Sequence, residues 1–443
     1  MSLVIITTAL WRYLAHRFSI LWSMLLLASC WTACQQARPT GAFNFYGGAT
    51  RANAYEDAVS FTDAMLITDF PRPNDSLAPS KAMMDVGSNM PPIPISFVAS
   101  YLTLLDGSAV RFAGGRIEWQ AFFDSIAPGK RALAAALPCT DASDNLYVLA
   151  SDGGLYSIDK NGKRRWKLAL FTPSSTTLYC DLLLQPSGIV VGWSVDGTHG
   201  TLAKCSFDGT ILWKRHHSLA PTRTFAADER QNLIVALSAN TAGITDSLVC
   251  IAPNGEQVWS RGIAHTRLFR TPVVASGIIL ITGIREHQNQ RDDVVYALDV
   301  NGQPRWEKVL SFTPQGIAVG TQESGTPLVV VAGYRTGIGE ALSVVVGLDI
   351  EAHELWRLHY DMAVIGAPMI SRNNIVLIGT KGEASGAYFM NKQGVFQRVV
   401  SLSNVAVCLI PAVDAENNIV FAATEALGIV KVGKLPTQRL LPY

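Results

Sequence analysis

A repeated pattern of glycine and tryptophan constrains this chain more than any other feature. Seven times a short apolar run reaches a two-residue turn, usually ending in Gly, and continues into a second run. In six copies a Trp stands four residues after the turn, and successive turns lie 42 to 50 residues apart. Such a regular period indicates a repeat protein. The pairs are Gly115 and Trp119, Gly162 and Trp166, Gly209 and Trp213, Gly255 and Trp259, Gly302 and Trp306, and Ala352 and Trp356, followed by a degenerate copy at Gly394 whose nearest aromatic is Phe396.

Each period carries the signals of β-strands. Apolar and polar residues alternate on both sides of Asn161-Gly162, which is the period-2 pattern of a strand. Asn-Gly favours a type I′ hairpin, in which both central residues take positive φ. Asp208-Gly209, Asn254-Gly255 and Asn301-Gly302 repeat this signal. Because two further β-rich runs precede the hairpins, we predict a four-stranded antiparallel sheet for each repeat and no long helix after residue 40.

A small twisted sheet with two apolar faces cannot bury both of them alone. Packing copies radially covers both faces and leaves short edges. The sequence therefore predicts an all-β fold, a β-propeller of four-stranded antiparallel blades. We expect the recurrent tryptophans to be structural residues between blades, since equivalent positions on a ring do not converge on one ligand. These residues are Trp119, Trp166, Trp213, Trp259, Trp306 and Trp356.

The number of blades depends on how the chain ends are used. Residues 408–413, 418–423 and 428–432 supply three strands after the seventh hairpin, and the isolated run 64–70 is suited to supply the fourth. We therefore predict eight blades, with seven as the alternative. In a competing arrangement residues 435–441 form the last strand, but Pro436 would remove a hydrogen-bond donor there.

The N-terminus resembles an export signal. Arg12 and Arg17 precede an apolar stretch at 18–27 and the small residues before Cys30. Leu27-Ala-Ser-Cys30 resembles a bacterial lipobox, which predicts a lipoprotein signal peptide at 1–29 and acylation of Cys30. Acylation of Cys34, cleavage to a soluble exported protein and an uncleaved anchor helix remain alternatives. We expect a tether and lead-in at 30–59 and a single propeller domain at 60–443.

Composition excludes some functions. The net charge is +1 and no basic stripe is present, so the chain lacks the electrostatic signature of nucleic-acid binding. Outside the leader region five cysteines are scattered singly, without Cys-x-x-Cys spacing. Cys205 and Cys250 align with core positions of other repeats, and Cys139 with Cys180 is a weak candidate for a disulfide.

We find no motif for catalysis, and we expect no catalytic residue, cofactor or metal site. Asp292 and Asp293 lie in the most polar segment, 285–293, where they have the chemistry for a cation, although a solvated hairpin tip is the favoured interpretation. Other insertions fall at one equivalent point of successive repeats, which places them on one face of the ring. Because loops on a rigid scaffold commonly carry binding, we expect this face to bind. The insertions span residues 194–201, 240–247, 334–341 and 381–386.

The string at 295–306, Val-Tyr-Ala-Leu-Asp-Val-Asn-Gly-Gln-Pro-Arg-Trp, resembles the PQQ-type β-propeller repeat of the quinoprotein-like superfamily, over about residues 96–432. Catalytic members of that superfamily hold a quinone and calcium centrally, commonly beside a vicinal disulfide, and no adjacent Cys pair exists here. The leader and length resemble the non-catalytic branch of BamB-like lipoproteins, which act as docking scaffolds in outer-membrane assembly.

This resemblance implies an exported, lipid-anchored scaffold in the cell envelope that faces the periplasm and binds another envelope protein, and not an enzyme. Repeat membership alone does not decide function, because one fold hosts many activities. The alternatives are a PQQ-dependent or other enzyme with its site in the central channel, and a propeller that senses a carbohydrate or another ligand.

Overall fold

The structure is a computed structural model. It describes residues 101–401 except 105, 114–115, 181, 239–245, 264–265, 269–271, 288–289, 336–341, 365–366, 371–373 and 382–383, and in addition residues 35–36, 66–69, 94–98, 406–407, 412–413, 419–424 and 430–435.

The described strands form eight antiparallel sheets of four or more strands, numbered here in chain order. The first sheet holds β3 (Pro94–Val98), β4 (Tyr101–Leu104), β5 (Ser108–Ala113) and β6 (Arg116–Phe122). The second holds β9 (Cys139–Thr140), β10 (Leu146–Leu149), β11 (Gly154–Ile158) and β12 (Arg164–Ala169). The third holds β13 (Leu178–Tyr179), β14 (Leu183–Gln185), β15 (Gly188–Ser194), β16 (Gly200–Cys205) and β17 (Ile211–His217), and β1 (Gln35–Gln36) joins it by parallel pairing with β14. The fourth holds β18 (Ala220–Ala227), β19 (Leu233–Ser238), β20 (Asp246–Ile251) and β21 (Gln257–Ile263).

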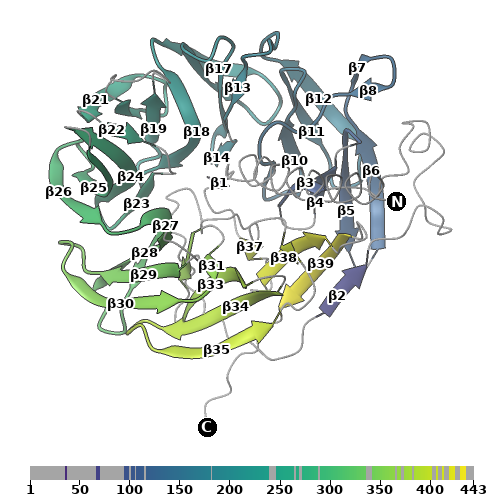
Figure 1. The fold of residues 1–443 in the computed structure, drawn as a ribbon. Coiled ribbons are helices and arrows are strands. Elements are labelled where there is room, and N and C mark those ends of the chain that lie inside the picture. The colour runs from purple at the N-terminus through teal and green to yellow at the C-terminus, as the bar shows by residue number, and fades with distance from the viewer. Residues whose placement is uncertain are drawn as a thin grey trace, which may run out of the picture.

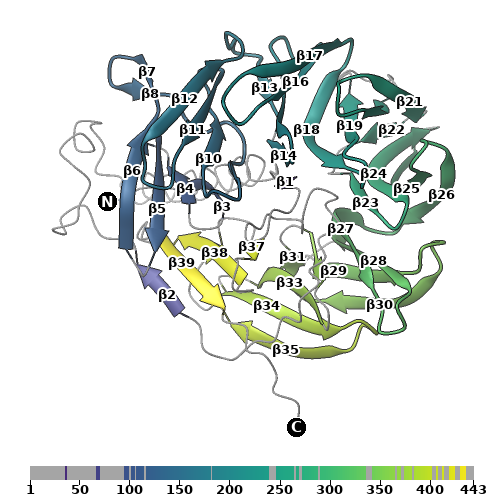
Figure 2. The same ribbon diagram turned by 180° about the vertical axis from the view of Figure 1, so that it is seen from behind.

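The other half of the molecule repeats this order. The fifth sheet holds β22 (Thr266–Leu268), β23 (Val273–Ala275), β24 (Ile278–His287), β25 (Gln290–Asp299) and β26 (Pro304–Leu310). The sixth holds β27 (Thr313–Thr321), β28 (Pro327–Arg335), β29 (Leu342–Leu348) and β30 (Glu354–Tyr360). The seventh holds β31 (Ala363–Val364), β32 (Met369–Ile370), β33 (Asn374–Lys381), β34 (Ala384–Asn391) and β35 (Phe396–Ser401). The eighth holds β36 (Ala406–Val407), β37 (Ala412–Val413), β38 (Ile419–Thr424), β39 (Val430–Leu435) and β2 (Leu66–Asp69). The sheets lie around a common centre (Figures 1 and 2).

The eighth sheet joins the two ends of the chain. β2 pairs antiparallel with β39, from Leu66 opposite Lys434 to Asp69 opposite Lys431. This confirms the predicted pairing of the N-terminal run with the C-terminal strands, and β2 occupies the outer position for which residues 435–441 were the alternative. The number of sheets favours eight blades over seven. Closure of the ring stays a prediction, because the segments between the strands of the eighth sheet lie outside the described residues.

The repeated hairpins have a different turn from the predicted one. Gly162 has a φ of +84°, but Asn161 does not have positive φ. The Gly162 amide donates to the Asp159 carbonyl, and a bulge follows where Ile158 pairs with Arg164. This is a type I turn with a glycine in the left-handed region and a bulge, so the type I′ prediction was wrong. Asp159 explains the choice, because its carboxylate accepts the amides of Asn161 and Lys163 and holds the turn.

The recurrent tryptophans connect successive sheets from the outermost strand of each sheet. Every indole Nε1 donates to a main-chain carbonyl in the third hairpin of the next sheet. The six bonds run from Trp119 to Lys160 (2.8 Å), Trp166 to Phe207 (3.0 Å), Trp213 to Pro253 (3.0 Å), Trp259 to Val300 (2.9 Å), Trp306 to Ile350 (2.8 Å) and Trp356 to Lys392 (3.0 Å). We call each such contact a tryptophan latch.

Glycine occupies the receiving turn of five latches, and Ala352 takes its place in the sixth. A Cβ added at Gly162, Gly209, Gly255, Gly302 or Gly394 would lie 2.6 to 2.9 Å from the indole of the preceding sheet. The indoles are only partly buried and pack on the edges of the apolar clusters. They are therefore latches at the rim rather than wedges in the core, which is made by the buried aliphatic residues of the inner strands.

Apolar residues from different sheets pack together near the centre of the molecule. Ala367, from the seventh sheet, belongs to the same apolar cluster as Ala136 and Leu184, which belong to the second and third sheets. In the order of the sheets, the third and seventh lie opposite each other (Figure 1). This contact joins the inner segments of opposite sides.

Cys139, Cys205 and Cys250 are buried free thiols, and the buried Cys180 thiol donates to the Pro221 carbonyl. The candidate disulfide between Cys139 and Cys180 was therefore wrong, whereas Cys205 and Cys250 are core residues as expected. Among the residues that the structure describes, no helix has both the length and the apolar character needed to cross a membrane.

Candidate functional site

A two-stranded hairpin projects between the first and second sheets. It consists of β7 (Ser125–Ala127) and β8 (Lys130–Arg131), joined by Pro128-Gly129. Gly129 has a φ of +70°, as the third residue of a type II turn requires after a proline. All six residues from 125 to 130 are exposed. Figures 1 and 2 show the hairpin standing out from the ring beside β6 and β12.

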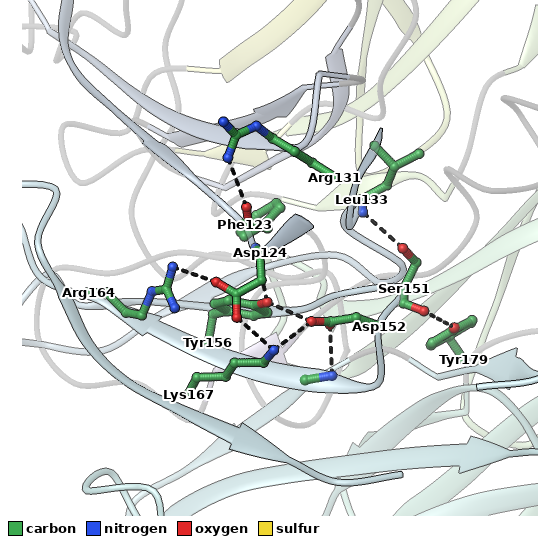
Figure 3. Close-up of polar contacts among 11 residues, drawn as sticks. Phe123, Asp124, Arg131, Leu133, Ser151, Asp152, Tyr156, Arg164, Lys167 and Tyr179 are labelled. Atoms are coloured by element: carbon green, nitrogen blue, oxygen red, sulfur yellow. Dashed lines mark hydrogen bonds and ion pairs between the residues drawn. The ribbon is translucent and has the colours of Figure 1, made fainter. Parts of the chain in front are cut away.

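The base of this hairpin is fixed by an ionic network (Figure 3). Asp124 lies directly before β7, and its carboxylate binds Arg164 and Lys167 of β12 at 2.8 Å each. The Lys167 ammonium also binds Asp152, again at 2.8 Å. Tyr156 donates its hydroxyl proton to Asp152 at 2.7 Å and accepts the Asp124 amide at 3.2 Å. The network therefore ties the segment leaving the first sheet to two strands and a turn of the second.

Apolar and main-chain contacts complete the base. Phe123 is buried, with its ring centroid 5.2 Å from that of Tyr156. The Ala132 amide donates to the Asp124 carbonyl at 2.9 Å, which closes the hairpin. The Arg131 guanidinium lies 4.3 Å from the Phe122 ring centroid and donates to the Phe123 carbonyl. Both strands of the hairpin therefore start from a rigid frame.

The network keeps Asp124 and Lys167 charged and Tyr156 neutral. The hydrogen bond from Lys167 lowers the pKa of Asp124 against the opposing effect of partial burial, and Arg164 acts in the same direction. Burial alone would lower the pKa of Lys167, but its hydrogen bonds to Asp124, Asp152 and Tyr156 outweigh it and raise that pKa. Burial, with the hydrogen bond to Asp152, raises the pKa of Tyr156 to about 12. No member of this trio changes protonation near neutral pH.

Two loops of the following sheets lie on the same face as the hairpin. Because the strands of each sheet alternate in direction, the hairpin between the second and third strands shares a face with the connection to the next sheet. Segment 170–177 is such a connection, and 194–199 is such a hairpin. They contact each other, since Ser174 and Thr176 donate to the Val195 carbonyl at 2.5 and 2.9 Å. We call residues 123–132, 170–177 and 194–199 together the crest.

Comparisons with known proteins bear on the fold that carries the crest. Residues 198–384 match the protein-family model described as outer membrane protein assembly factor BamB. The solved Dos1 propeller has a TM-score of 0.52 at 14% identity, over 80% of this chain and 94% of that one. The dihydro-heme d1 dehydrogenase NirN, solved in complex with DHE, has a TM-score of 0.51 at 13% identity, over 86% and 81%. The chain has the β-propeller fold, and residues 198–384 are similar to the BamB family.

Two further comparisons give a weaker structural match and no sequence match. BamB from Moraxella catarrhalis superposes with a TM-score of 0.47 at 14% identity, over 85% of this chain and 100% of that one. No curated protein sequence gives a match. At these identities the solved structures establish the propeller fold alone, so the activity of this propeller has to be argued from its own residues.

Asp292 and Asp293, for which the sequence favoured a solvated hairpin tip over a cation site, lie in a strand of the propeller. β24 and β25 stay paired as far as His287 opposite Gln290, so Asp292 and Asp293 belong to β25 and not to a loop tip. Arg285 binds Asp292 at 3.0 Å, and Thr313 donates to Asp293 at 2.9 Å. Within the described ranges no three His, Cys, Asp or Glu side chains are grouped to hold a metal ion.

Of the other predicted sites, the tryptophans lie in the outermost strands of the sheets, and several of the rest lie outside the described residues. The six tryptophans occupy the latches at the rim and do not converge. Residues 194–199 of the insertion 194–201 belong to the crest, whereas most of 240–247 and 334–341 lies outside the described residues. Cys30 also lies outside them, so its acylation and the signal peptide at 1–29 stay predictions.

Sequence reasoning missed the crest hairpin and one buried cation. Pro128-Gly129 is a turn signal that predicts a hairpin, but the strands on either side are too short to show alternation. Lys204 in β16 is 1% exposed and donates to the Gln185 side chain at 2.7 Å. Burial lowers the pKa of Lys204. The equivalent positions of other repeats hold Ser157, Cys250 and Ala297, so no periodic signal marks a lysine there.

Replacing Asp124 with Asn is expected to weaken the propeller modestly at neutral pH and not at all in acid. The Asp124 side chain is 36% exposed, so its two ion pairs contribute about 1 kcal/mol at most after solvent screening. Its folded pKa lies below the unfolded one, so the stabilisation is present above the unfolded pKa and is lost as the pH falls through the folded pKa. Urea unfolding of both proteins between pH 7 and pH 3 measures this, and a difference that does not change with pH would contradict it.

Proposed function

We propose that this chain is an exported, lipid-anchored, non-catalytic propeller that binds an envelope protein through its crest. The observation that carries the proposal is the crest itself, a projecting hairpin on a fixed base beside two contacting loops. Rigid scaffolds that present shaped loops on one face are suited to binding, because little conformational entropy is lost on association. The matched family is described as an outer membrane protein assembly factor, which supports a partner that takes part in outer-membrane protein assembly.

The chemistry of the crest supports binding over acid–base catalysis. A general acid or base works best when its pKa lies near the operating pH. The pKa of Asp124 is lowered, away from neutral pH, and the pKa values of Lys167 and Tyr156 are raised, also away from neutral pH. Each of them is also engaged by its neighbours in the network. These groups are therefore suited to hold a surface in shape.

The position of β1 supports attachment close to a membrane. Gln35 and Gln36 pair with Leu183 and Leu184 of β14. Cys30 is five residues before Gln35, and five residues span about 18 Å at most. An acylated Cys30 therefore holds the ring near the membrane surface, and two or more acyl chains make such attachment stable.

Crosslinking in intact cells tests this function. We expect a discrete envelope protein to be captured with the tagged full-length chain. Replacing residues 195–199 by a Gly-Ser segment of equal length should reduce that capture several-fold. The matched control changes Glu323 and Ser324 to Ala in the turn between β27 and β28, on the opposite face, and should not affect it. Absence of any captured envelope protein would refute the function.

A further inference from the structure

We propose that hairpin β7–β8 is the element of the crest that docks the partner, and that it recognises an acidic protein surface around an apolar groove. This inference rests on the proposed function, because it identifies how the scaffold would hold its partner.

The shape of the hairpin suits insertion into a groove. Its tip is surrounded by solvent, since a Cβ added at Gly129 would meet no atom within 4 Å. Ile126 keeps 54% of its surface exposed at this projecting position. An apolar side chain on a projecting hairpin is a suitable anchor, because the base of the hairpin is already held in place in the free protein. The partner should therefore offer an apolar pocket for Ile126.

The charges around the tip are mainly positive. Lys130 and Arg131 lie in the hairpin, and Arg164 and Lys167 lie at its base, against Asp106 near Arg131 and the two carboxylates of Asp124 and Asp152. Those two carboxylates are already bound by Arg164 and Lys167. Lys130 is exposed, so its ammonium is accessible to a partner. Complementary charge gives association its orientation and speed, which favours an acidic rim on the partner.

The adjacent loop favours a protein over an anionic membrane as the occupant. Asp196 and His199 project from the crest loop at 194–199, with side chains 53% and 69% exposed. Hydrogen bonds from the His199 amide and ring, and from the Thr198 amide, lower the pKa of Asp196, so its carboxylate stays charged. A lipid surface of uniform negative charge would repel this carboxylate. A protein surface is able to present different charges to Lys130 and to Asp196.

Site-specific photocrosslinking of the full-length protein in intact cells tests this. Benzoylphenylalanine is placed at Ile126 and, as a control, at Lys163, which is exposed on the opposite face. We expect an adduct from position 126 whose partner peptide, mapped by mass spectrometry, carries acidic residues beside an apolar segment. Lys130→Glu should lower its yield about tenfold, which corresponds to about 1.4 kcal/mol. Lys130→Arg should retain it, and raising the ionic strength should reduce it.

The outcomes separate this inference from the proposed function. An equal yield at position 163, a mapped peptide without acidic residues, a lipid adduct, or a yield unaffected by Lys130→Glu would each overturn the inference. If the tagged chain still captures an envelope protein in those cases, the scaffold function stands without it. If no protein is captured by any route, the function itself fails. Thermal unfolding of the variants controls for folding, and we expect no change because both side chains are exposed.

Discussion

Replacing Trp259 with Ala is expected to lower the free energy of unfolding by about 3 kcal/mol. The indole donates to the Val300 carbonyl at 2.9 Å and packs on the cluster formed by the fourth and fifth sheets. The substitution removes that bond and leaves a gap between the two sheets. Equilibrium unfolding in urea measures the loss.

Two controls show whether the latch or the surface is responsible. Val258→Ala changes the neighbouring residue, which is 57% exposed, and should alter stability by less than about 0.5 kcal/mol. Trp259→Phe keeps a ring but loses the donor, so it should cost about 1 kcal/mol from the hydrogen bond alone. If Trp259→Ala and Val258→Ala have equal effects, the latch does not hold the sheets together.

Replacing Gly302 with Val is expected to cost a similar amount, about 3 kcal/mol, from the receiving side of the same latch. Gly302 has a φ of +78°, and a Cβ there would lie 2.8 Å from the Trp259 ring. Backbone strain and the clash both contribute, so the cost should fall to about half in a Trp259→Ala background. Strictly additive effects of the two substitutions would contradict this coupling.

Ala352 allows the opposite substitution, because Ala stands at this repeat turn where the other repeats have Gly. Ala352 has a φ of +69°, which is unfavourable for a residue with a Cβ. Ala352→Gly should therefore raise the free energy of unfolding by about 1 kcal/mol, as measured by the same urea titration. No gain in stability would show that the strain at this turn is relieved in another way.

The repeated sheets were predictable because the same glycine and tryptophan recur at a fixed spacing in the sequence. A glycine in the left-handed region and an indole above it leave a fixed spacing in the sequence, so the sheets and the latches between them could be expected. The turn type could not, because it depends on Asp159 accepting two amides, and Asn161-Gly162 alone suggests another turn.

The crest was less predictable for the same reason. Its hairpin has strands of two and three residues, too short for a period, and its stability comes from Asp124 and Lys167, which are 43 residues apart. Such pairings between sheets leave no local pattern. The extension of β24 and β25 was missed because their polar residues resemble a loop, although they form ion pairs across a continuing ladder, as Arg285 and Asp292 do.

The most direct test of the central claim, that this propeller is a lipid-anchored envelope protein, is labelling of cells with radioactive palmitate. The account predicts that the full-length chain is labelled and sediments with membranes, that Cys30→Ala loses both properties, and that Cys34→Ala keeps them. A chain that stays unlabelled and membrane-bound, or one that loses its label only with Cys34→Ala, would contradict the assignment of Cys30 as the anchor.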